Sequence, residues 1–261
     1  LFNDNGTAGA MIALSGHKIE SSYKNGAGFN SEEFATNKHF NQKPHSELAK
    51  INIKPNDTHE LELSGRFYNN NFNRRKIDAK DYYAKYRYTP LNDLFDSEIR
   101  LSHSQASQKF EGDSLMSLRN ANAKNTSDSL VVKNTSRFNY GEIDMALTLG
   151  SKLMSTEYKR SVIAPSTDPW QSNNMVENNT FAPQGKNDLT SFFSQMKFEY
   201  DIYTLDLNLN YVDYNIKGYK PACAARDACF PEGEMNVNRH DRNWDPGVLL
   251  SAEIISEFQP F

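Results

Sequence analysis

The sequence predicts an all-β protein, an antiparallel up-and-down β-barrel that spans a membrane. Three observations predict this fold: apolar and polar residues alternate at period two, short and long links follow one another in turn, and the composition lacks the aliphatic content of a large dry core. Apolar residues are only 38% of the 261 residues, yet aromatic residues reach 12%. This composition suits a chain with apolar stripes and no thick packed interior.

The period-two alternation is the spacing of a β-strand, in which successive side chains point to opposite faces. In the clearest case, Leu61, Leu63 and Phe67 alternate with Glu62 and Arg66. None of the alternating segments spaces its apolar residues at three and four, as an amphipathic helix does. The ten candidate strands cover 8–17, 49–54, 60–67, 81–88, 97–101, 130–138, 142–149, 190–200, 205–212 and 248–254.

Short and long links between these segments alternate without exception. The short links cover 55–58, 90–96, 139–141 and 201–202. The long, polar links cover 18–46, 69–80, 106–128, 155–187 and 217–244. In an up-and-down sheet all short turns then lie at one end and all long loops at the other, as in outer-membrane barrels with short periplasmic turns. We therefore expect five long extracellular loops.

A soluble antiparallel sandwich is the alternative fold, because its strands alternate in the same way. A sandwich rarely needs five such long loops, and its inner faces must fill a core about 10 Å thick. In a large barrel, by contrast, charged strand residues such as Glu62, Arg66 and Asp206 face a wet lumen and need no buried partner. Aromatic residues near the strand ends fit interface girdles, although aromatic residues also favour strands in general.

Several function classes are excluded by charge and motif content. The formal net charge of −4 argues against a nucleic-acid partner, which is normally held by clustered basic residues. The chain has no Gly-x-Ser-x-Gly elbow, His-Glu-x-x-His pair, CxxC or phosphate-cradling glycine loop, so we expect no enzyme and no metal site. No run approaches the ~20 apolar residues of a membrane helix. The pattern is interrupted at Leu1 and at Phe261, so we expect a piece of a longer protein.

Two hairpin sequences resemble those of TonB-dependent outer-membrane receptors. Residues 53–63 (IKPNDTHELEL) and residues 88–101 (YTPLNDLFDSEIRL) are similar to periplasmic hairpins of that family. Residues 181–186 (FAPQGK) and residues 239–250 (RHDRNWDPGVLL) are similar to segments of its haem, haemoglobin and hemophore receptor branch. The resemblance is diffuse and extends over most of the chain.

The resemblance implies a bacterial outer-membrane receptor with a 22-stranded barrel plugged by an N-terminal domain. Residues 1–261 would then be a partial barrel of about ten strands, with the plug and the C-terminal strands outside this chain. The implied function is import of haem, captured outside from a hemophore or haemoglobin and driven by the TonB complex on the periplasmic side. Outer-membrane lipid would surround the strands, and haem would be cargo, not a catalytic cofactor.

Candidate cargo-binding residues lie in the expected loops. In the family the axial histidines occupy segments that this chain lacks, so none is assigned here. His240 is flanked by Arg239 and Arg242 at the end of the fifth loop, and His39 lies in the first. We expect His240 to contact haem or its protein carrier and the arginines to meet a propionate. The competing interpretation is that these are solvated loop residues.

Two cysteines stand six positions apart in the fifth loop, Cys223 and Cys229. The oxidising cell envelope favours a disulfide between them, which would stiffen the loop. Free thiols or a metal site are the alternatives, but no histidine at ligand spacing supports zinc.

Two other functions remain open. A siderophore or metal-chelate receptor would use the same scaffold with different loop chemistry. A small ten-stranded outer-membrane protease would use Asp and His residues at its rim, although no motif of such an enzyme is present.

Overall fold

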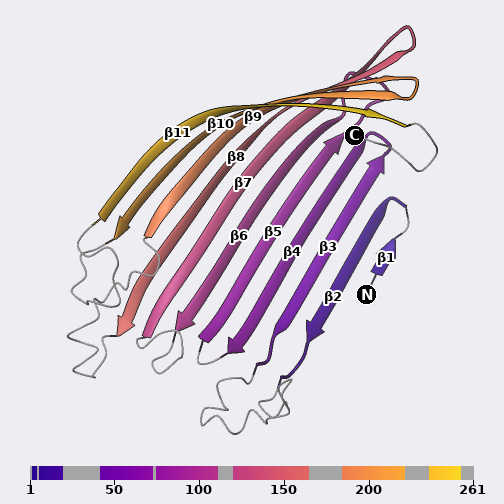
Figure 1. The fold of residues 1–261 in the computed structure, drawn as a ribbon. Helices are drawn as coiled ribbons and strands as arrows, with labels where there is room; N and C mark the ends of the chain where they lie inside the picture. Colours follow the sequence, from indigo (N-terminus) through magenta and orange to yellow (C-terminus); the bar gives the residue numbers. More distant parts are fainter. Residues whose placement is uncertain are drawn as a thin grey trace, which may run out of the picture.

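The computed structural model describes residues 2–4, 6–19, 42–72, 75–110, 120–164, 184–220 and 235–253, and every regular element among them is a β-strand. These strands are β1 (Phe2–Asp4), β2 (Ala8–Gly16), β3 (His45–Asn56), β4 (His59–Phe72), β5 (Arg75–Tyr88), β6 (Ser97–Phe110), β7 (Asn120–Tyr140), β8 (Ile143–Ala164), β9 (Gln184–Tyr200), β10 (Tyr203–Lys220) and β11 (Met235–Ala252). They form one sheet in chain order, and each strand is antiparallel to the next. The sheet is curved and twisted, with β1 and β11 at its two edges (Figure 1).

The predicted all-β, up-and-down fold is confirmed. Strands β2 to β11 correspond to the ten expected strands, and the short β1 precedes them. We call the end of the sheet with turns 57–58, 141–142 and 201–202 the short-turn end, and the opposite end the long-loop end. In the part of the chain that the structure describes, no helix is long and apolar enough to cross a membrane.

The strands run further toward the long-loop end than the alternation predicts. Strands β7 and β8 have 21 and 22 residues, about twice the 9–11 that a membrane crossing needs. In the link expected over 69–80, residues 69–72 and 75–80 are instead paired strand, with Asn69 opposite Asp78 and Asn70 opposite Ile77. On the β4 side Asn69, Asn70 and Asn71 put polar residues on both faces, so the period-two signal is lost there although the backbone ladder continues.

Two of the short turns are held by asparagine side chains, and a third contains a glycine. The Asn56 Oδ1 accepts hydrogen bonds from the backbone N–H groups of Thr58 and His59, at 3.1 and 3.0 Å. The Asn92 Oδ1 does the same for Leu94, at 3.1 Å. Such bonds from an asparagine to the backbone two or three residues ahead stabilise turns. Gly141 has a φ of 65°, a conformation that glycine adopts without strain.

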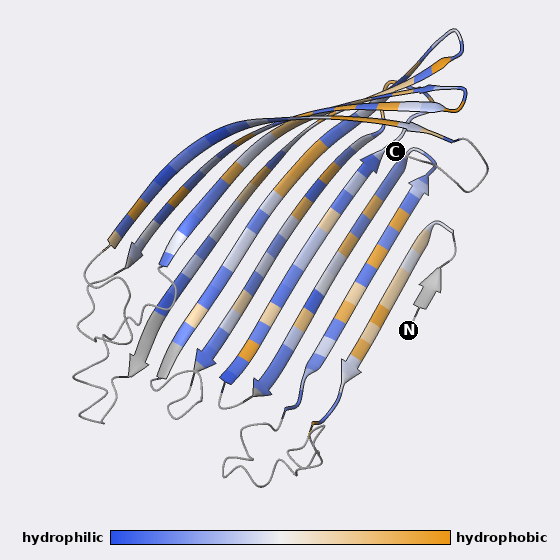
Figure 2. Cartoon of the chain, viewed as in Figure 1, coloured by the Kyte–Doolittle hydropathy of each residue, from blue (hydrophilic) through white to orange (hydrophobic). Residues whose placement is uncertain are grey.

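The two faces of the sheet differ in chemistry. The outer face carries Leu63, Leu101 and Val248, whereas the inner face carries Glu62 and Glu98, because neighbours along a strand point to opposite sides. Figure 2 shows this alternation of hydrophobic and hydrophilic residues along the strands.

The apolar face is the exposed one. Val248 is 74% exposed and Leu101 51%, whereas the side chains of Glu62 and Glu98 are only 16% and 12% exposed. Side chains crowd on the inside of a curved sheet, so we assign the charged inner face to the concave side. This arrangement is the reverse of a soluble sandwich, in which apolar faces meet in a sealed interior.

Candidate functional site

Aromatic rings line the long-loop edge of the apolar band on the outer face. Tyr211 contacts Phe192 and Trp244, with ring centroids 6.5 and 4.8 Å apart. Further along the sheet, Phe67 packs edge-on against Tyr82 at 5.9 Å. These five residues share the outer face by register, and we call them the upper belt.

A second set of aromatic rings lies at the short-turn end of the same face. His59 lies 5.1 Å from the ring of Tyr88, and its Nδ1 is 2.7 Å from the Tyr86 hydroxyl. Tyr140 and Tyr203 are the corresponding exposed rings at neighbouring turns. We call these residues the lower belt.

The spacing of the two belts matches the thickness of a membrane. Tyr203 and Tyr211 are eight residues apart on β10, or about 26 Å along the strand. A strand tilt of 35–45° reduces this to about 20 Å, near the ~25 Å apolar band of outer-membrane barrels. Between them, Leu205, Leu207 and Leu209 all point outward.

The inner face at the same level carries ion pairs. Glu62 on β4 lies between Lys50 and Lys85 of the neighbouring strands, at 3.0 and 3.3 Å. Glu98 pairs with Arg100 at 2.5 Å on β6. Such charges are stable only where water or polar groups reach them, so the inner face is suited to a wet lumen and not to an apolar core.

An ionic cluster fixes the β5–β6 turn to β7. The Asp96 carboxylate accepts two hydrogen bonds from Arg87, at 2.9 and 3.0 Å, and one from Arg137 at 3.0 Å. The hydrogen bonds from Arg87, aided by Arg137, hold the pKa of Asp96 below its ordinary value although burial acts in the opposite direction. The carboxylate is therefore ionised at neutral pH and ties three elements together.

Two of the candidate cargo residues, His240 and Arg242, lie on β11 and point to the outer face beyond Trp244. The Asp213 carboxylate on β10 lies 2.9 Å from His240 Nε2 and accepts a hydrogen bond from Arg242 Nε at 2.8 Å. The hydrogen bond with His240, followed by that from Arg242, lowers the pKa of Asp213. Both residues belong to a paired strand, not to the loop that the sequence suggests.

The third candidate, Arg239, points to the inner face. Its Nε donates to Asp241 at 2.9 Å, and the Tyr214 hydroxyl donates to the same carboxylate at 3.0 Å. The hydrogen bond from Tyr214 has the larger effect, and together with that from Arg239 it lowers the pKa of Asp241. The Asp241 carboxylate in turn raises the pKa of Tyr214. Arg239 stays 70% exposed, so its guanidinium is accessible from the inner side.

The remaining candidates, His39, Cys223 and Cys229, lie outside the described residues. Within the described ranges, no cluster of three or more His, Cys, Asp or Glu side chains is arranged to hold a metal ion.

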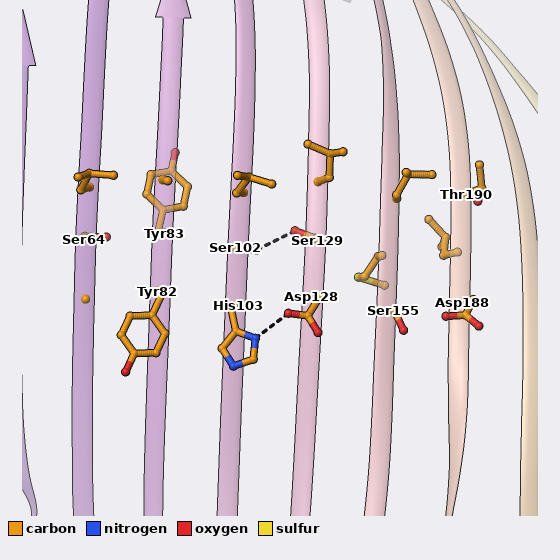
Figure 3. Close-up of a pocket in the computed structure, with 18 of the residues that line it drawn as sticks. Ser64, Tyr82, Tyr83, Ser102, His103, Asp128, Ser129, Ser155, Asp188 and Thr190 are labelled. Atoms are coloured by element: carbon orange, nitrogen blue, oxygen red, sulfur yellow. Dashed lines mark hydrogen bonds and ion pairs between the residues drawn. The ribbon is translucent and has the colours of Figure 1, made fainter.

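The structure adds a furrow of about 860 Å³ on the outer face, and Tyr82 of the upper belt is part of its lining. Small residues make room for it at Ala49, Gly65 and Ala84, and Leu63 and Leu101 supply apolar walls. Figure 3 shows its polar side, where His103 Nδ1 is 2.6 Å from Asp128 Oδ1. The furrow can hold an apolar chain with a polar end near His103.

The His103–Asp128 pair could not be predicted from the sequence, because 25 residues separate the two in the chain. Only the register between β6 and β7, in which they are directly opposite, brings them together. A period-two pattern gives the face of each residue but not its register with the next strand, so no sequence signal could have identified this pair.

Comparisons with known proteins show what the fold is similar to. The Serratia marcescens hemophore receptor HasR, solved with its hemophore HasA and heme, matches with a TM-score of 0.65 and 15% identity over 96% of this chain. The FrpB iron transporter of Neisseria meningitidis matches at 0.66 with 12% identity over 99%, and the siderophore receptor PiuA of Acinetobacter baumannii at 0.66 with 11% over 97%. The sequence matches no protein-family model and no curated protein.

The chain spans only part of these proteins, 38%, 41% and 44% of their respective lengths. At such low identity the likeness shows the fold alone. It supports the all-β, up-and-down architecture, which matches a segment of the strand wall in each of the three.

Proposed function

We propose that this chain forms part of the barrel wall of a TonB-dependent receptor in the bacterial outer membrane that imports an iron compound. One observation carries the proposal: the outer face has an apolar band between two aromatic belts, whereas the inner face of the same strands carries ion pairs. That combination suits a wall with lipid on one side and a wet lumen on the other. The three similar structures, all receptors or transporters, support the same conclusion.

The open sheet favours a partial barrel over a small closed one. Strands β1 and β11 pair with β2 and β10 alone, so each leaves one edge without a partner among the described residues. In hydrocarbon every backbone N–H and C=O must be paired, so further strands would have to continue the wall at both edges. A ten-stranded protease would instead close on itself.

Transport in this proposal involves no covalent step. The loops capture the cargo outside, the cargo passes through the lumen past a plug, and the TonB complex supplies the energy from the short-turn side. The wall contributes a rigid scaffold on which loops can vary, which is where binding residues tend to concentrate.

We favour haem from a hemophore or haemoglobin as the cargo. The support is the resemblance of residues 181–186 and 239–250 to haem receptors, together with the hemophore receptor among the similar structures. A siderophore or metal chelate is the second candidate, and the siderophore receptor PiuA and the ferric citrate transporter FecA among the neighbours favour it.

Within the haem proposal the described candidate residues have different tasks. Arg239 faces the lumen with an exposed guanidinium, so it would meet a haem propionate. His240 and Arg242 face outward and would touch only a carrier protein that extends over the rim. His39 is proposed as a contact in the first loop, and a Cys223–Cys229 disulfide as a brace in the fifth.

The test is a titration of the full-length protein with haem, read from the Soret band, beside titrations with ferric siderophores and ferric citrate. We expect saturable haem binding, weakened at least fivefold by Arg239→Ala and unchanged by Arg242→Ala. Those two variants remove the same charge from opposite faces. Saturable binding of a ferric chelate without any haem response would replace haem by the second candidate. Absence of the protein from the outer-membrane fraction would overturn the receptor proposal itself.

A further inference from the structure

The outer face carries three pairs of lysines near the long-loop end, and in each pair the two lysines lie directly opposite each other on neighbouring strands. The register places Lys76 opposite Lys109, Lys124 opposite Lys159, and Lys186 opposite Lys217. All six are exposed. Like charges directly opposite in a sheet destabilise it by repulsion. A protein with a net charge of −4 that concentrates lysines in this way has a local basic surface that an anionic partner would neutralise.

The last of these pairs borders a hollow of about 610 Å³ over β8 to β11. Lys159, Lys186 and Lys217 line it, and the other polar residues of the lining are Glu157, Tyr158, Gln184, Tyr219, Asn236 and Asn238. Gly185 and Gly218, which lie opposite each other, have no side chain, so only their backbone forms the floor. The hollow therefore presents ammonium, amide and phenol donors toward the outside of the wall.

The carboxylates near the hollow do not balance its positive charge. Glu157 pairs with Lys159 at 2.7 Å, and Asp188, which is outside the lining, pairs with Lys186 at 2.9 Å. Lys217 forms no salt bridge with any residue that the structure describes. Asp188 also attracts Lys217 electrostatically, so three ammonium groups stand against two carboxylates and the hollow keeps a net positive charge.

The hollow stands at the height of lipid headgroups. Lys217 is six residues beyond Tyr211 of the upper belt on β10, about 20 Å along the strand at ~3.3 Å per residue. A tilt near 45° converts this to about 14 Å above the edge of the apolar band. Sugars and phosphates of outer-leaflet lipids occupy that layer, whereas the barrel lumen and its cargo lie behind the wall.

We propose that this hollow binds the phosphorylated sugar headgroup of an outer-leaflet glycolipid, lipopolysaccharide in a bacterial outer membrane. The lysines pair with phosphate as point charges, and the Asn236 and Asn238 amides and the Tyr219 hydroxyl bond to sugar hydroxyls. The inference rests on the proposed outer-membrane location but not on the identity of the cargo. The bound lipid would fix the strand extensions of β8 to β11, which carry the loops, at a defined height.

The test uses the full-length protein in detergent, stripped of lipid and titrated with purified lipopolysaccharide. The variant is Lys186→Gln/Lys217→Gln, with Lys133→Gln/Lys152→Gln as the matched control, because Lys133 and Lys152 lie on the inner face. We expect the first variant to lose at least tenfold in lipid affinity, the control to lose none, and Lys186→Arg/Lys217→Arg to keep the original affinity. Chemically dephosphorylated lipopolysaccharide should bind the original protein at least tenfold more weakly.

Three outcomes would overturn the proposal. They are equal affinity of both glutamine variants, equal affinity for dephosphorylated lipid, and displacement of the lipid by inorganic phosphate at submillimolar concentration, which would identify a free-phosphate site. Far-ultraviolet circular dichroism and resistance to unfolding in detergent verify that each variant is folded. Failure here with the protein present in the outer-membrane fraction rejects only the lipid site, whereas absence from that fraction rejects the receptor proposal.

Discussion

The indole of Trp244 on β11 lies against the phenol ring of Tyr211 on β10, with ring centroids 4.8 Å apart and an interplanar angle of 49°. The indole remains 61% exposed, at the long-loop edge of the outward apolar band. Aromatic rings at such an edge settle at the interface between hydrocarbon and headgroups. We therefore expect Trp244 to lie at the interface of the outer leaflet.

Fluorescence quenching by spin-labelled lipids checks this depth. In vesicles, the emission of Trp244 is obtained as the difference between the original protein and Trp244→Phe. It should be quenched most by a label near the headgroup and least by a label at the end of the acyl chain. The control is Tyr203→Trp in the Trp244→Phe background. It removes the indole of the upper belt and introduces one in the lower belt of the same strand pair. Equal quenching of Trp244 by both labels, or none by either, would contradict a lipid-facing belt.

The Asp96 cluster predicts a stability effect at the short-turn end. Asp96→Asn removes the charge that accepts three hydrogen bonds from Arg87 and Arg137. Hydrogen bonds to charged groups contribute roughly 1.5–3 kcal/mol, so the variant should lose about that free energy of unfolding. Urea unfolding in lipid vesicles measures it. Asp93→Asn in the same turn is the control and should change the midpoint little, because the Asp93 side chain has no role in the cluster.

The same cluster predicts a pH dependence. The pKa of Asp96 is lower in the folded protein than its ordinary value of 3.8, mainly because of the hydrogen bonds from Arg87. A carboxyl with a depressed folded-state pKa stabilises the fold fully above its unfolded-state pKa and loses that contribution as pH falls through the folded value. The stability difference between the original protein and Asp96→Asn should be constant from pH 7 to about 5 and shrink below about pH 4. A difference that does not shrink at all as pH falls below about 4 would assign the effect to packing.

Gly150 on β8 predicts a close-packing effect on the inner face. A Cβ at this position would lie 2.8 Å from the Val132 carbonyl oxygen and would overlap the ring of Phe193 on β9. The backbone oxygen cannot move without breaking the ladder, so Gly150→Ala should cost about 1–3 kcal/mol. Gly65→Ala is the matched control, because its nearest atom, Tyr82 Cδ1, is 3.7 Å away. Thermal unfolding of both variants in one detergent compares them, and equal midpoints would refute the steric account.

The sequence was sufficient to predict the faces of the central strand segments and the alternation of short and long links. Leu63 and Glu62 fall on the expected faces because period two is a direct consequence of strand geometry. The extent of the strands was not predictable. Residues 69–72 and 75–80 are paired strand, yet Asn69, Asn70 and Asn71 are all polar, so no alternation marks the end of β4.

The candidate site was predictable in part for the same reason. Arg239, His240 and Arg242 were identified as a cluster, but without a strand assignment nothing indicated that His240 and Arg242 face away from Arg239. The Asp213 that joins His240 and Arg242 is 27 residues from His240, and the register between β10 and β11 supplies the contact. The lysine hollow depends on the register of three strand pairs, so it too becomes visible only in three dimensions.

The Cys223–Cys229 disulfide stays a prediction with a direct chemical test. Reduction of the pure protein should raise its mass by two hydrogens, and alkylation after reduction should label both cysteines but neither beforehand. Closing so short a ring removes chain freedom worth about 2 kcal/mol in the loop. Because the two cysteines stand in the sequence between β10 and β11, Cys223→Ser/Cys229→Ser should leave the unfolding of the sheet unchanged and should speed proteolysis between Lys220 and Met235. Alkylation of both thiols in the unreduced protein, with no mass change on reduction, would mean that the two cysteines are free.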